Sequence, residues 1–234
     1  MNFTLSTEEI LLVARKATAA FASYGLYSCL CGGVGCVLYG CQRTPSDVDL
    51  VVMTDRYDQE ELKRMLVRKD GDFYLTPSRK IGATYKIVYC RLDQRSFKTC
   101  KVDVLTPGIM NIPHIANDRI IQARSIPIMP FIPLLLLKLQ AWSDHRNSTR
   151  FDMRSKQYRD VSDIKELLAI GARRQEKLES AQWLPESFLS AATRRIIDFG
   201  MYYPECKKDW GTIGFTIPVF SNTGERVQSY HRFG

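Results

Sequence analysis

Two aspartates inside an apolar strand pattern constrain this chain more than any other feature. The stretch SDVDLVV, residues 46–52, sets Asp47 and Asp49 one residue apart among Val and Leu. Residues i and i+2 of a strand point to the same face, about 6.6–6.8 Å apart along the chain. Aspartate is disfavoured in strands and costly to bury without a partner. We therefore expect the strand to bury Val48 and Leu50 and to present both carboxylates to a ligand.

A third aspartate occupies the same kind of position later in the chain. Asp103 lies between Val102 and Val104 in the stretch CKVDVLT. If its strand neighbours that of Asp47 and Asp49, the three carboxylates converge. Carboxylates this close repel one another unless a cation joins them, and such oxygen ligands suit Mg²⁺, with Mn²⁺ as the alternative ion. The other interpretation is that Asp103 is a water-exposed residue at a strand edge.

A glycine pair precedes these aspartates. Gly32 and Gly33 come before a short helical pattern that ends at Gly40. Backbone N–H groups at a helix N-terminus donate to phosphate oxygens, and glycine lets the backbone approach closely. The GK[ST] of a P-loop is missing, and Leu38 stands where a dinucleotide fingerprint requires Gly or Ala. We therefore expect a phosphate-binding turn of another kind.

The first half of the sequence has a mixed α/β pattern. Ser6 and Glu9 form a capping box for a helix that we expect to stop near Gly25. Residues 58–71 have the period of an amphipathic helix, and residues 83–108 have the pattern of strand, turn and strand. The further segments with a strand pattern are residues 27–31, 46–53, 73–78 and 125–130, the last as an edge strand.

The pattern changes after about residue 125 and becomes helical. We expect a catalytic domain over residues 1–125 and a helical domain with an irregular tail over residues 126–234. The predicted helices of the second half are residues 131–146, 157–174, 175–184 and 185–200.

Charge and cysteine content narrow the class of protein. The chain has 33 Lys+Arg against 25 Asp+Glu, a formal charge of +8. This favours a polyanionic partner such as nucleic acid or nucleotide phosphates, with a generically basic protein as the other interpretation. The seven cysteines include no CxxC pair, so we expect free thiols, although a bridge between Cys90 and Cys100 stays open. Without a signal-peptide or membrane-span pattern, we expect a soluble, cytoplasmic protein.

The succession of a Gly-Gly turn, a short helix, RTPSDVDL and a later strand aspartate resembles the DNA polymerase β-type nucleotidyltransferase superfamily. The resemblance implies an α/β (α+β) fold, with a mixed sheet, flanking helices and a C-terminal helical domain. Many relatives have Ser, Thr or Ala directly after the glycines, whereas this chain has Val34, so a hydroxyl contact to phosphate is absent there.

The same resemblance assigns roles to residues of the first half. The catalytic metal ligands that it implies are Asp47, Asp49 and Asp103. The nucleotide contacts that it implies are Gly32, Gly33 and Ser46.

A second block is similar to the segment that follows the catalytic domain in AbiEii/MenT-type toxin nucleotidyltransferases. It consists of LLLLKLQAWSDHR and YRDVSDIKELL. By that resemblance Lys138 contacts the triphosphate, Arg159 is a phosphate partner, and Asp160 or Asp163 orients Lys138 or the acceptor. The alternative is a snorkelling Lys138 on a buried helix, followed by a surface helix with i,i+4 charge pairs.

Together these features predict transfer of NMP from an NTP to an acceptor hydroxyl, with release of pyrophosphate. RNA, such as a tRNA end, is the favoured acceptor, and the toxin-like block adds an antitoxin-like protein as a partner. The alternatives are a small antibiotic-type molecule, a protein hydroxyl, or an inactive domain that only binds nucleotides or RNA. The three histidines are isolated in sequence and are interpreted as structural or surface residues: His114, His145 and His231.

Overall fold

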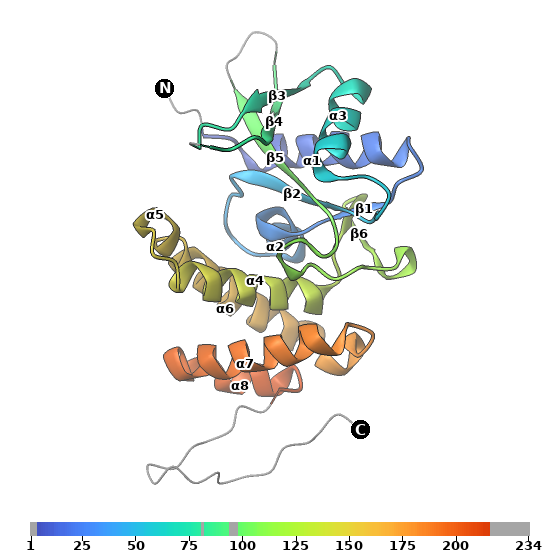
Figure 1. Cartoon of the computed structure of the whole chain (residues 1–234). Coiled ribbons are helices and arrows are strands. Elements are labelled where there is room, and N and C mark those ends of the chain that lie inside the picture. The colour runs from blue at the N-terminus through green and yellow to red at the C-terminus, as the bar shows by residue number, and fades with distance from the viewer. Residues whose placement is uncertain (1–3, 81, 94–97, 216–234) are drawn as a thin grey trace, which may run out of the picture. The chain divides into compact units, whose positions relative to one another are not determined.

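The computed structural model describes residues 4–80, 82–93 and 98–215 (Figure 1). The chain divides into two compact units between Leu137 and Lys138. This point lies inside helix α4 (Phe131–Arg146). Residues 126–137, which the sequence pattern places in the helical half, therefore fall in the first unit, and a separate catalytic and helical domain stays a prediction.

The first unit contains a seven-stranded mixed sheet, which confirms the predicted α/β class (Figure 1). The strand order is β3-β4-β5-β2-β1-β7-β6. The pairs β2–β5 and β1–β7 are parallel, and the other four pairs are antiparallel. The strands are β1 (Ser28–Leu30), β2 (Asp47–Val52), β3 (Phe73–Pro77), β4 (Lys86–Arg91), β5 (Thr99–Leu105), β6 (Ile121–Ala123) and β7 (Ile126–Ile128).

Three helices pack on this sheet. Helix α1 (Thr7–Ala22) contacts β1 and β2, α2 (Gly32–Tyr39) contacts β2, and α3 (Gln59–Lys69) contacts α1, β3 and β5. The predicted capping box is confirmed at α1, where the Glu9 N–H donates to Ser6 Oγ at 3.2 Å and the Ser6 N–H donates to Glu9 Oε2 at 2.7 Å. Such reciprocal caps satisfy N–H groups that a helix start leaves without partners.

The predicted hairpin is confirmed as β4 and β5. Cys90 and Cys100 lie directly opposite each other in this pair, but both are free thiols, as are the other five cysteines. Burial raises the pKa of the Cys100 thiol to about 12 and that of Cys29 to about 12. The open alternative of a Cys90–Cys100 bridge is therefore wrong.

The far side of the sheet differs from the prediction. The strand expected at residues 125–130 exists as β7, but it lies between β1 and β6, so it is not the edge. Ile126 and Ile128 are fully buried, which explains the interior position. The edge is β6, a strand that the sequence pattern did not indicate because it has only three residues and Ile121 is 45% exposed.

The second unit is helical. Trp142 of α4 packs edge-on against Phe199, with ring centroids 4.9 Å apart. The remaining α-helices are α5 (Phe151–Arg154), α6 (Gln157–Arg174), α7 (Glu186–Tyr202) and α8 (Lys207–Thr212). The helix predicted at residues 175–184 is wrong: a left-handed Gln175 (φ 58°) ends α6, and only a 3₁₀ turn at Leu178–Ala181 follows.

The beginning of the predicted irregular tail is ordered by packing. The sequence pattern leaves residues 201–234 without a period, yet α8 forms there, and Trp210 and Ile213 are fully buried. Residues 216–234 of that tail lie outside the described residues. No helix in the described ranges is both long and apolar enough to cross a membrane.

Candidate active site

The register of two neighbouring strands brings the three predicted acids together. Asp49 of β2 lies directly opposite Asp103 of β5, and Asp47 lies opposite Lys101. Because β2 and β5 are parallel and side chains alternate between faces, all four side chains belong to one face of the sheet. The residues between them, such as Val48 and Val102, are buried with at most 1% exposed. The acids are each partly exposed, so they are accessible from that face.

Lys101 places a positive charge among these acids, a feature that the sequence analysis did not single out. Its ammonium donates a hydrogen bond to Asp103 Oδ2. Burial lowers the pKa of Lys101, but the hydrogen bond to Asp103 and the charges of Asp103, Asp47 and Asp49 outweigh burial and raise this pKa above its ordinary value. The acid cluster therefore has an internal counter-cation.

The glycine pair lies against the same cluster. Helix α2 begins at Gly32, which has φ +55°, and a Cβ atom there would lie 1.8 Å from Asp49 Oδ2. A Cβ atom on Gly33 would lie 2.3 Å from Arg43 Nη2. Gly32 is thus required by its positive φ and by Asp49, whereas a side chain on Gly33 would have to displace the end of Arg43. The Asp49 carboxylate also sits where a helix N-terminus favours negative charge.

Ser46 is exposed and its hydroxyl donates to Asp47 Oδ1 at 3.1 Å. The predicted nucleotide contact is therefore attached to one of the acids. Any role of Ser46 toward a nucleotide stays a prediction.

The donor chemistry of this cluster fits a divalent ion, but the present arrangement is not a closed ligand set. Across residues 4–80, 82–93 and 98–215, no three Asp, Glu, His or Cys side chains are grouped so as to hold a metal ion. Mg²⁺ commonly binds one or two protein carboxylates and completes its shell with water and substrate phosphates. Asp47 and Asp49 match that requirement, whereas Asp103 is engaged by Lys101.

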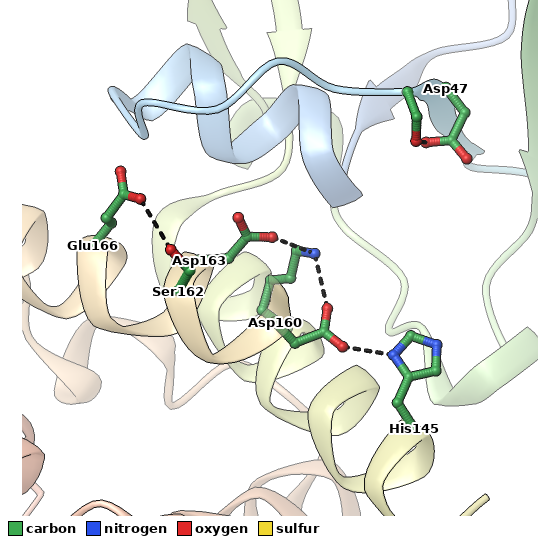
Figure 2. A network of polar contacts seen from close by, with 8 residues as sticks. Asp47, His145, Asp160, Ser162, Asp163 and Glu166 are labelled. Atoms are coloured by element: carbon green, nitrogen blue, oxygen red, sulfur yellow. Dashed lines mark hydrogen bonds and ion pairs between the residues drawn. The ribbon is translucent and has the colours of Figure 1, made fainter. Parts of the chain in front are cut away.

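The second unit holds the other predicted residues, in a buried network between α4 and α6 (Figure 2). Lys138 Nζ lies 2.7 Å from Asp163 Oδ2 and 3.3 Å from Asp160 Oδ1. Lys138 is 8% exposed, Asp160 4% and Asp163 0%. The alternative of a snorkelling lysine followed by a surface charge helix is therefore wrong, because the ammonium and both carboxylates are buried together.

His145, interpreted from the sequence as a structural or surface residue, belongs to this network. Its Nδ1 lies 2.5 Å from Asp160 Oδ2 (Figure 2). His145 follows Lys138 by two helical turns on α4, and this spacing was the available signal. Arg159, by contrast, is exposed and has no ion pair with any described residue.

Comparisons with known proteins address the fold. No protein-family model matches the sequence, and no curated protein matches it. The structure is similar to the crystal structure of an antigenic nucleotidyltransferase-like protein from Paracoccidioides brasiliensis, at a TM-score of 0.66 and 15% identity. That match covers 89% of this chain and 94% of the other.

This chain has the nucleotidyltransferase fold. Weaker matches include ANT(2'')-Ia in complex with adenylyl-2''-tobramycin, at a TM-score of 0.40, 14% identity and coverage of 71% and 99%. Another is the E. coli MS115-1 CdnC:HORMA-deltaN complex, at a TM-score of 0.37 and 14% identity. That match covers 95% of this chain and 77% of the other. At such TM-scores these two matches add no weight, and closeness to AbiEii/MenT-type toxins stays a prediction.

Proposed function

We propose that this chain is a metal-dependent nucleotidyltransferase, which transfers NMP from an NTP to an acceptor hydroxyl and releases pyrophosphate. The observation that supports it most is the pairing of Asp49 with Asp103 across two parallel strands, with Asp47 on the same face. Three partly exposed carboxylates on one sheet face are costly for a fold unless a cation or ligand uses them.

The reaction forms a bond between the acceptor oxygen and the α-phosphorus and breaks the bond to the bridging oxygen of the leaving pyrophosphate. Asp47 and Asp49 would hold Mg²⁺, or Mn²⁺, which when bound supplies positive charge to the phosphate oxygens. Asp103 would join them near the acceptor and take the hydroxyl proton on its carboxylate. In such reactions, positioning and electrostatic stabilisation provide most of the catalysis.

The remaining predicted residues act on the nucleotide in this proposal. Gly32, Gly33 and Ser46 are assigned to the phosphates, and so are Lys138 and Arg159 of the second unit. Lys138 could contact the triphosphate from a fixed position because two buried carboxylates hold its ammonium. Asp160 and Asp163 would then act by orienting Lys138.

RNA, such as a tRNA end, is the acceptor we propose, because the chain carries a net charge of +8 and its second block resembles toxin enzymes. An antitoxin-like protein partner and a cytoplasmic location belong to the same proposal. A small antibiotic-type molecule and a protein hydroxyl are the other acceptors. One observation favours a second function, a domain that only binds nucleotides or RNA: Lys101 already occupies Asp103.

Label transfer tests these functions against one another. The protein is incubated with each α-labelled NTP and Mg²⁺, together with total RNA, lysate protein, an aminoglycoside or no acceptor. We expect label in RNA from the wild type and from Asp118→Asn, an exposed aspartate outside the cluster, and none from Asp49→Asn. Label in protein or the aminoglycoside contradicts the RNA assignment, and nucleotide binding without any transfer favours the binding domain.

A further inference from the structure

The segment around α5 exposes two aromatic rings to an unusual degree. Phe151 is 79% exposed and Tyr158 is 71% exposed, the largest values among the big apolar side chains in the part of the chain that the structure describes. Contiguous exposed apolar groups mark interaction sites, whereas single ones are normal on a protein surface. Two such rings seven residues apart in sequence are therefore a candidate contact surface.

Cations without acidic partners accompany the two rings. Arg154, Lys156 and Arg159 are exposed and form no ion pair with any residue in the described ranges. Some other cations of the second unit are paired, for example Arg146 with Asp198 at 3.2 Å and Lys165 with Glu205 at 2.7 Å. Three cations without an ion pair among the described residues thus accompany the two exposed rings in sequence. We call this set the α5 patch: Phe151, Arg154, Lys156, Tyr158 and Arg159.

We propose that the α5 patch is a docking surface for single-stranded RNA, an inference that rests on the RNA acceptor of the proposed function. Aromatic rings stack on unpaired bases while neighbouring Lys and Arg side chains contact the phosphates, and this combination is sequence-tolerant. A membrane-binding helix instead gathers its apolar residues on one long face. Helix α5 has only four residues, with Phe151 at its start and Arg154 at its end.

The two kinds of side chain predict two different signatures. Each stacked ring contributes about a tenfold change in affinity on substitution by alanine. Each cation that neutralises a phosphate contributes about 0.7 to the slope of log affinity against log salt for a single strand. Phe151→Ala/Tyr158→Ala should therefore weaken binding about a hundredfold at constant slope. Arg154→Gln/Lys156→Gln should reduce the slope by about 1.4.

Fluorescence anisotropy of a short labelled single-stranded RNA tests this without nucleotide or metal. Leu12→Ala removes an exposed apolar side chain elsewhere, and Arg64→Gln/Arg68→Gln removes the same charge from α3. Both controls should bind like the wild type. Circular dichroism melting checks that each variant is folded.

Further probes decide between partners. The same strand in a duplex should bind more weakly, because its bases are not free to stack. Vesicles containing phosphatidylserine should not bind. Equal RNA affinity of the ring variant and the wild type overturns the proposal, as does vesicle binding in place of RNA binding. Since Asp49→Asn should still bind RNA, a failure of nucleotidyl transfer and a failure of the docking surface are separate outcomes.

A second inference comes from Lys101, whose contacts are independent of the α5 patch. Lys101 precedes Asp103 by two strand positions, lies opposite Asp47, and donates a hydrogen bond from its ammonium to Asp103. We infer that Lys101 competes with a divalent ion for Asp103, an inference that rests on the metal dependence of the proposed function. An ion approaching Asp103 must displace this ammonium or accept its repulsion.

The expected consequence is a low affinity for the free ion. Asp47 and Asp49 add two negative charges on the same face, and the ion is bound best when a triphosphate adds further oxygen ligands. Lys101 would thus offset the charge of Asp103 until nucleotide and ion arrive together. Removing its charge should make the cluster a better site for the ion alone.

Titration with Mn²⁺, followed by electron paramagnetic resonance in the absence of nucleotide, measures this directly. Lys101→Met keeps the length of the side chain and should raise the Mn²⁺ affinity about tenfold. Lys86→Met on the adjacent strand β4 is the control and should have no effect. Unchanged or weaker affinity of Lys101→Met, with Mn²⁺ binding in the wild type, overturns this inference alone. Absence of Mn²⁺ binding in every variant, even with NTP, overturns the proposed metal dependence as well.

Discussion

The two groups of acidic residues in this molecule are built in opposite ways. Asp47, Asp49 and Asp103 are partly exposed and are aligned by strand register. Asp160 and Asp163 are buried and are held by Lys138 through two ion pairs. The carboxylates of the first group can be reached from solvent, while those of the second are enclosed within the protein.

This difference suits the strand cluster to ligand binding and the helix network to holding side chains in place. Water and ions reach a carboxylate on an open sheet face at little cost, so the strand cluster can exchange partners. A buried charge must keep its partner, because an uncompensated charge in the interior is strongly unfavourable. We therefore expect substitutions in the strand cluster to affect activity, and those in the helix network to affect stability.

The largest effect is expected in the strand cluster. Asp103→Asn should lower nucleotidyl transfer about 10³-fold, since the amide neither takes the acceptor proton nor binds the ion as strongly. Its free energy of unfolding should change by no more than about 0.5 kcal/mol, because the side chain is partly exposed. Transfer assays and urea denaturation measure the two quantities. Strong destabilisation by Asp103→Asn would contradict the expected difference between the strand cluster and the helix network.

In the helix network we expect the larger effect on stability instead of on activity. Asp163→Ala should lower the free energy of unfolding by about 3–5 kcal/mol, since it removes the carboxylate 2.7 Å from the buried Lys138 ammonium. The double variant Lys138→Met/Asp163→Leu replaces the pair by apolar groups and should recover most of that loss. Urea denaturation tests both. If the double variant is as unstable as the single one, the burial of the pair does not explain the cost.

A smaller effect is expected at the glycine turn. Gly32→Ala should destabilise the fold by about 2 kcal/mol, because alanine is strained at positive φ and its Cβ would displace the Asp49 carboxylate. Gly71→Ala is the control: its Cβ meets no atom within 4 Å, and no such loss is expected. Thermal melting compares the two variants. Equal melting temperatures would mean that the Asp49 side chain moves away from a Cβ at position 32 at little cost, which contradicts the prediction.

The smallest effect concerns the core face of β5, behind the acids. The pKa of Cys100 is raised to about 12 by burial, while an unfolded thiol ionises near about 8.5. The unfolded state therefore loses its proton first as the pH rises, and stability falls by up to about 1.4 kcal/mol per pH unit for this thiol. Cys100→Ala should remove that part of the loss between about pH 8.5 and 9.5. Denaturation of both proteins across this range measures it, and parallel curves would contradict it.

The local parts of this structure could be predicted from sequence. Period-two alternation placed Asp47 and Asp49 on one face, and the capping box at Ser6 located the start of α1. The helix period gave α6 with its observed bounds. These features depend on residues close in sequence, whose chemistry acts locally.

The non-local parts could not be predicted. Whether β5 pairs with β2 in parallel, and in which register, depends on the whole sheet. The sequence alone therefore could not establish that Asp49 lies opposite Asp103. Nothing in the sequence distinguishes Lys101 and Arg43 from ordinary strand or loop cations. Their contacts with the acids and with Gly33 are visible only in the structure. His145 was missed because its partner, Asp160, lies on another helix.

The parallel pairing of β2 with β5 also determines when the site can exist. The first two acids are synthesised early, but the strand that carries Asp103 follows only after α3, β3 and β4. A growing chain that has released Asp47 and Asp49 therefore presents an incomplete cluster, without Asp103 and without the lysine that neutralises it. Such distant strand pairings form slowly in folding. A newly made molecule can thus complete its acid cluster only after β5 has been synthesised and has paired with β2.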